Sequence, residues 1–157
     1  MSYERFLNMT PAPATPSRGR VLVVDDNPII QRTMYFALRD KGYSVLMSGD
    51  LTEALAIVRK EKLDVILLDI NFPPAGTVNG AGGRDGFWAL SWMKRMDEVK
   101  DIPIIIISGD DPASASPRAR AAGAAAYLHK PINKEEMALI IAELMAERKA
   151  GLLPPTI

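Results

Sequence analysis

The chain of 157 residues has no cysteine, no net charge and no long apolar run. Without cysteine it can have neither a disulfide framework nor a metal site with thiolate ligands. Lysine and arginine number 19, as do aspartate and glutamate, so the whole chain has no general attraction for nucleic acid or anionic membranes. No apolar run approaches the roughly 20 residues that span a bilayer, and residues 1–17 lack the apolar core of a secretory signal. We therefore expect a cytoplasmic protein without direct DNA binding or membrane contact.

The remaining composition is that of an ordinary globular protein of one-domain length, with 48% hydrophobic and 24% charged residues. Proline marks both ends of the chain. Residues 1–17 contain three prolines among small residues, and residues 150–157 are rich in glycine and proline. We expect a flexible tail at each end and a folded domain over residues 18–149.

Five short apolar runs alternate with segments of helical periodicity in the folded domain. We expect strands at 21–24, 45–47, 65–68, 104–107 and 125–128. Three of the runs are almost continuously apolar, which is typical of strands buried on both faces of a parallel sheet. Strict alternation predicts right-handed crossovers and therefore an α/β domain of three layers.

Capping residues indicate where several of the helices begin. Three residues suit the N-cap position: Asn27, Asp50 and Asn133. The helix after Asp50 should run to about residue 62, and another helix is expected at about 86–96. Pro117 lies where the interior of a further helix should be, so we expect that helix to be kinked or to begin only after Pro117.

Polar residues stand at the carboxyl ends of four expected strands. They are Asp25 and Asp26, Asp69, Ser108 with Gly109, and Lys130 with Pro131. In open α/β sheets, ligands bind outside the carboxyl ends of the strands. We therefore expect these residues to meet at one rim of the sheet.

The three aspartates predict a metal site, because clustered carboxylates repel one another unless a cation joins them. Oxygen ligands with room for water suit Mg²⁺, which commonly binds one or two carboxylates and a substrate phosphate. Asp69 beside such a metal is a reasonable nucleophile that can form an aspartyl phosphate. Lys130 and the Ser108 hydroxyl can contact phosphate oxygens, and Gly109 leaves space for them.

These residues lie in four motifs, VVDDN, LLDI, ISGDD and YLHKP. With these motifs, residues 19–148 resemble the CheY-like receiver domain of two-component response regulators. The resemblance implies a flavodoxin-like (βα)5 fold with a parallel five-stranded sheet of order 2-1-3-4-5. It also implies a bacterial phosphorelay protein that dephosphorylates itself slowly at most and is not a turnover enzyme.

The same resemblance implies a role for each site residue. Asp69 would be the phosphoacceptor. Mg²⁺ would bind Asp69, Asp26 directly, Asp25 mainly through water, and the backbone carbonyl of Asn71. Ser108 and Lys130 would contact the phosphoryl group. Ser108 and Tyr127 would form the conformational switch. Gly109 and Pro131 would have structural roles, Pro131 through a cis Lys130–Pro131 bond.

One segment departs from the family pattern. Residues 71–85 make a connection of 15 residues, whereas such loops usually have about 2–6. Their glycines match neither a P-loop nor a dinucleotide-binding motif. We expect a flexible insertion at about 72–85 over the rim, and hypothesise that it gates the access of a phosphodonor or phosphatase.

The implied phosphodonor is a sensor histidine kinase or a histidine phosphotransfer protein, and the output is an unknown protein partner, with a homodimer left open. No effector module fits residues 149–157, so we expect no DNA-binding domain in this chain. One alternative is the receiver part of a larger regulator or hybrid kinase. Others are a degenerate receiver that only binds, and a haloacid-dehalogenase-like phosphohydrolase, which needs a second aspartate where Asn71 stands.

Overall fold

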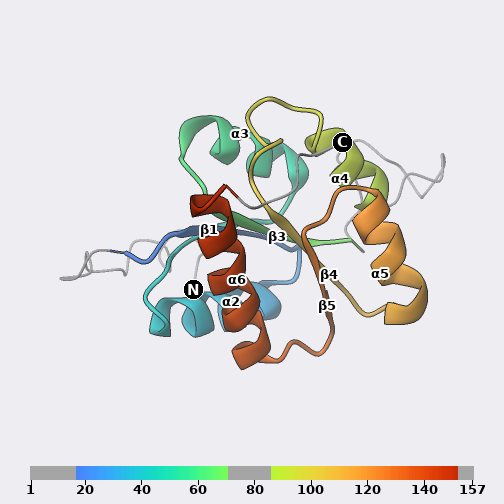
Figure 1. The fold of residues 1–157 in the computed structure, drawn as a ribbon. Coiled ribbons are helices and arrows are strands. Elements are labelled where there is room, and N and C mark those ends of the chain that lie inside the picture. Colours follow the sequence, from blue (N-terminus) through green and yellow to red (C-terminus); the bar gives the residue numbers. More distant parts are fainter. Residues whose placement is uncertain (1–16, 71–85, 152–157) are drawn as a thin grey trace.

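Five parallel strands form the centre of the molecule. The computed structural model describes residues 17–70 and 86–151, and its sheet has the strand order β2-β1-β3-β4-β5 (Figure 1). The strands are β1 (Arg20–Val24), β2 (Ser44–Ser48), β3 (Val65–Asp69), β4 (Ile104–Ser108) and β5 (Ala126–His129). The expected fold, strand order and parallel pairing are confirmed.

Helices cover both faces of this sheet (Figure 1). On one face α2 (Pro28–Asp40) and α6 (Lys134–Lys149) pack against Val23, Leu67 and Ile105. On the other face α3 (Leu51–Lys60), α4 (Gly86–Met93) and α5 (Pro112–Ala121) pack against the alternate strand residues, which include Leu22, Ile66 and Ile104. Successive strand residues point to opposite faces, so β3 and β4 are buried at every position.

Side-chain caps set the starts of the helices, as expected from the sequence. The Asn27 side chain accepts hydrogen bonds from the backbone N–H groups of Ile29 and Ile30. Asp50 accepts one from Glu53 N at 2.7 Å, and Asn133 accepts from the two N–H groups at positions 135 and 136. Each cap satisfies N–H groups that have no partner within the helix. The cap of α2 also places that helix directly after the Asp25 and Asp26 pair.

Two helices end earlier than expected. Helix α3 ends at Lys60, because Glu61 has an extended backbone with φ −117° and ψ 145°. Helix α4 ends at Met93, and the following residues form turns in which Arg95 N and Met96 N donate to carbonyls three residues back. Such three-residue bonds commonly close a helix.

The expectation that a helix begins only after Pro117 is wrong. Helix α5 begins at Pro112 and continues through Pro117 to Ala121. The Asp111 side chain caps its first turn by accepting from Ala113 N at 3.2 Å, and Ala115 and Ala119 bury its inner face. Pro117 is exposed, so its ring does not enter the core. The cap and the buried alanines outweigh the local cost of the proline.

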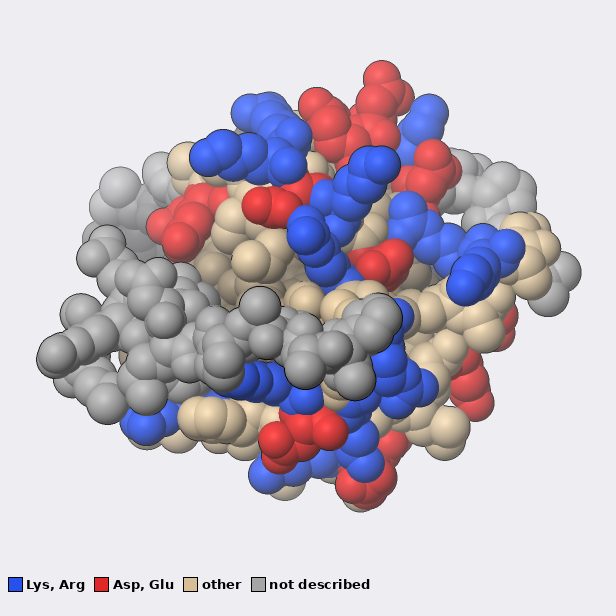
Figure 2. Space-filling view, turned by 90° about the vertical axis from the view of Figure 1, so that its left-hand side faces the viewer, with Lys and Arg blue, Asp and Glu red and all other residues tan. Residues whose placement is uncertain are grey.

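Figure 2 shows Lys and Arg side chains interspersed with Asp and Glu on the face that it presents. The described residues on that face therefore form no large field of one sign. In the part of the chain that the structure describes, no helix is long and apolar enough to cross a membrane. Residues 1–16 of the expected N-terminal tail, the expected insertion at 72–85, and residues 152–157 of the expected C-terminal tail lie outside the described residues.

Replacing Pro117 by alanine should stabilise the protein. Alanine restores a backbone N–H for the carbonyl of Ala113 and removes the clash of the proline ring, so we expect the free energy of unfolding to rise by about 1–3 kcal/mol. Urea denaturation measures this change, with Ser116→Ala as the control on the same helix. Lower stability of the Pro117 variant would show that the proline is accommodated without cost.

Candidate functional site

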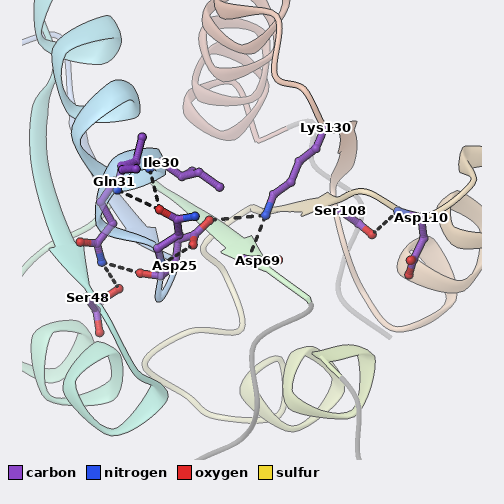
Figure 3. Close-up of polar contacts among 10 residues, drawn as sticks. Asp25, Ile30, Gln31, Ser48, Asp69, Ser108, Asp110 and Lys130 are labelled. Carbon is purple, nitrogen blue, oxygen red and sulfur yellow. Dashed lines mark hydrogen bonds and ion pairs between the residues drawn. The ribbon is translucent and has the colours of Figure 1, made fainter.

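The expected polar residues meet at the carboxyl edge of the sheet (Figure 3). Val24 is paired with Leu68, so Asp25 and Asp69 follow from neighbouring strands at the same level. Asp25, Asp69 and Ser108 are buried, at 1%, 4% and 0% exposure, whereas Asp26 is exposed. The parallel polarity of the strands brings together residues that are far apart in the sequence.

Lys130 reaches into this group from the end of β5. Its Nζ lies 3.2 Å from Asp69 Oδ2 and 3.7 Å from Asp25 Oδ2. The backbone N–H of Lys130 donates to the carbonyl of Ser108 at 2.8 Å. The peptide bond between Lys130 and Pro131 is cis, as the resemblance implied. The ammonium therefore sits between two buried carboxylates and offsets part of their repulsion.

The carboxyl group of Asp25 is buried in an environment that disfavours its charged form. Its Oδ1 accepts a hydrogen bond from Asn27 N at 2.8 Å, but its buried Oδ2 has no hydrogen-bond donor among the described residues. Burial raises the pKa of Asp25 to about 6, and the charges of Asp69 and Asp26 add to this, against the opposing Asn27 N–H and Lys130. The protein has thus placed a carboxyl group where its charged form lacks full compensation.

The donor set fits a hard divalent cation. Carboxylate oxygens of Asp25, Asp26 and Asp69 all lie within 4.8 Å of one another. A cation there would coordinate Asp25 Oδ2, which has a distant ion pair with Lys130 but no hydrogen bond among the described residues. Carboxylates with one exposed member also leave room for water, as Mg²⁺ prefers. Asn71, the fourth expected ligand, lies outside the described residues.

The two expected switch residues both bond to the backbone of Asp110. The Ser108 hydroxyl accepts from Asp110 N at 2.9 Å, and the Tyr127 hydroxyl donates to Asp110 O at 2.9 Å. Around Gly109 the space is open, because a Cβ there would meet no described atom within 4 Å. Sequence reasoning did not identify Asp110 as the link between Ser108 and Tyr127.

Sequence reasoning also missed Gln31, a buried amide on α2. Its Nε2 donates to the backbone carbonyls of Asp25 and Ser48 (Figure 3). One signal could have found it. Gln31 stands at helical spacing with Met34 and Leu38 on the apolar face of α2, where a polar residue needs a buried partner.

Comparison with known proteins gives one consistent match. A family model described as response regulator receiver domain matches residues 21–142. PilH of Pseudomonas aeruginosa is 31% identical over 128 residues, which are 82% of this chain and 98% of PilH. The crystal structure of a CheY-like response regulator receiver domain protein from Methanospirillum hungatei has a TM-score of 0.71 and 26% identity, and the match covers 86% of this chain and 99% of that one.

Some matching proteins are much longer. The alginate biosynthesis transcriptional regulatory protein AlgB of Pseudomonas syringae is 28% identical over 136 residues, which are 87% of this chain and only 28% of AlgB. The chain therefore corresponds to nearly all of some similar proteins and to about a quarter of this longer one.

The raised pKa of Asp25 predicts a pH-dependent stability. Between an ordinary pKa near 3.8 and its folded value of about 6, the folded state binds more protons than the unfolded state, so stability falls as pH rises through this range. Between pH 4.5 and 7 the expected loss in the free energy of unfolding is about 2 kcal/mol. Asp25→Asn should remove this dependence, and urea denaturation in a chelating buffer at about pH 4.5 and 7 would measure it. Equal slopes for variant and wild type would contradict the assignment.

Proposed function

Because the chain belongs to the response regulator receiver domain family, we propose that Asp69 accepts a phosphoryl group from a phosphohistidine. The observation that supports this most is the contact of Lys130 Nζ with Asp69 Oδ2 at 3.2 Å, beside a cluster of three carboxylates. Asp69 ends the buried strand β3, so its carboxylate is held in place by the sheet. A fixed carboxylate next to an ammonium can attack phosphorus while the incoming charge is stabilised.

The transfer needs few participating groups. A carboxylate oxygen of Asp69 forms a bond to phosphorus as the bond between phosphorus and the imidazole nitrogen breaks, and that electron pair stays on the imidazole. Lys130 can then move from the carboxylate to a phosphoryl oxygen, to which the Ser108 hydroxyl can also donate. Lys130 is already in contact with Asp69, whereas the Ser108 hydroxyl first has to leave its hydrogen bond with Asp110 N.

Mg²⁺ is the proposed cofactor, held by Asp25, Asp26 and Asp69, with the backbone carbonyl of Asn71 as a further ligand. When bound it would neutralise charge on the phosphoryl oxygens. The buried Oδ2 of Asp25, which accepts no hydrogen bond from the described residues, and the close approach of the three carboxylates support this ligand set.

The proposed partners follow from the chemistry of transfer. A sensor histidine kinase or a histidine phosphotransfer protein supplies the phosphoryl group, and a downstream protein distinguishes the two states. We further propose that the chain is a phosphoacceptor switch with slow self-dephosphorylation, whether it acts alone or within a longer regulator. The family match favours this function over the phosphohydrolase alternative.

The output would depend on Asp110. A phosphoryl group that draws the Ser108 hydroxyl away competes with the bond from Asp110 N to Ser108 Oγ. Asp110 also accepts the Tyr127 hydroxyl and precedes α5. A change at Ser108 can therefore bias the connection between β4 and α5 between two arrangements.

Asp69→Asn should abolish phosphorylation. With acetyl phosphate and Mg²⁺ we expect labelling to fall at least about 100-fold, because an amide lacks the nucleophilic oxygen. Phosphate-affinity electrophoresis would measure the labelled fraction. Asp111→Asn is the matched control, since asparagine also caps a helix and the residue lies on the same rim. Wild-type labelling of the Asp69 variant would refute the assignment.

Ser108→Ala should separate phosphorylation from the response. We expect labelling to persist, while beryllofluoride with Mg²⁺ shifts the backbone amide resonances of α5 by less than half of the wild-type change, because the hydroxyl that links the phosphoryl group to Asp110 is missing. Phosphate-affinity electrophoresis would measure the labelling, and heteronuclear NMR would measure the shifts of the amide resonances. Ser114→Ala, which removes a hydroxyl on α5 itself, is the control, and an undiminished response in the Ser108 variant would show that the link runs elsewhere.

A further inference from the structure

The amide of Gln31 lies where the pairing of β1 with β2 stops. The last paired residues are Val24 and Ser48, and the next N–H, of Asp25, donates to Ser48 O at 3.1 Å. Beyond that point Gln31 Nε2 donates to the carbonyl of Asp25 and, at 3.0 Å, to the carbonyl of Ser48 (Figure 3). A side chain on α2 thus joins the two strand ends where the ladder of backbone bonds has ended.

This contact acts on the backbone between the two adjacent aspartates. The carbonyl of Asp25 and the N–H of Asp26 belong to one planar peptide group, so a bond that fixes the carbonyl direction fixes the whole plane. Asp25 is additionally held through its own N–H and through its carboxylate Oδ1. Asp26 is exposed, so the orientation of this peptide group decides where its carboxylate can point.

Gln31 is also suited to hold this geometry firmly. It is only 5% exposed, and it is anchored on α2 between the cap at Asn27 and the buried residues Met34 and Leu38. A buried donor shared by two buried carbonyls does not exchange readily for water. The carbonyl of Ser48 receives both Asp25 N and Gln31 Nε2, which uses its two lone pairs.

We propose that Gln31 is a positioning residue for the metal site: its amide fixes the peptide group between Asp25 and Asp26 and so directs both carboxylates toward the cation. The proposal rests on the proposed function, because it takes the three aspartates as Mg²⁺ ligands. Gln31 contacts neither metal nor phosphoryl group and acts only through the backbone.

Gln31→Met tests the proposal, since methionine has a similar length and no N–H donor. We expect the dissociation constant for Mg²⁺, measured by calorimetry on metal-free protein, to rise by about 10-fold or more, the usual effect of losing a group that orients metal ligands. Met34→Ala is the control, because it disturbs the packing of the same helix face without touching the peptide group. It should bind Mg²⁺ within about twofold of wild type after an equal or larger loss of thermal stability.

A second measurement does not need the metal. In metal-free protein, NMR relaxation should show a lower order parameter for the amide of Asp26 in Gln31→Met but not in Met34→Ala. If the methionine variant fails to fold, Gln31→Asn can replace it. This variant withdraws the amide by one methylene and should give the same changes in Mg²⁺ affinity and in the order parameter of Asp26. Wild-type affinity and wild-type order in the Gln31 variants would overturn the proposal. A wild-type chain that binds no Mg²⁺ would instead overturn the proposed function, and the positioning role with it.

Discussion

The site depends on the burial of two carboxylates at the ends of adjacent central strands. Asp25 and Asp69 are almost fully removed from solvent, and an uncompensated charge in such a place is expensive. The compensation comes from three directions: the ammonium of Lys130, the N–H of Asn27, and the positive end of the α2 dipole. It is incomplete at Asp25, and this incompleteness is what makes a divalent cation a natural partner.

The layers of the fold make this burial possible. Because α2 and α6 cover one face and α3, α4 and α5 the other, β3 is enclosed along its whole length, including its last residue. All strands run in the same direction, so the residues at their carboxyl ends all lie at one edge of the sheet. A one-residue shift of β3 would exchange its two faces and turn Asp69 away from Lys130.

The strand ends could be predicted from the sequence because apolar runs and the polar residues after them are local signals. This holds for Asp25, Asp26, Asp69 and Lys130, which the structure brings together. Gln31 could not be placed in the same way, since the carbonyls that it contacts are set by the meeting of α2 with two strand ends. The late helix start expected at Pro117 was wrong because the cost of the proline is local, whereas the burial of Ala115 and Ala119 that offsets it depends on the folded sheet.

The side-chain hydroxyls of Ser108 and Tyr127 both bond to main-chain atoms of Asp110. Ser108 accepts from its N–H, and Tyr127 donates to its carbonyl. The side chain at position 110 is therefore free to vary during evolution without breaking the connection. Only proline at position 110 would directly remove the hydrogen bond to Ser108, because proline has no backbone N–H. A signal from the rim to α5 would thus pass through the peptide groups of residue 110 rather than through its side chain.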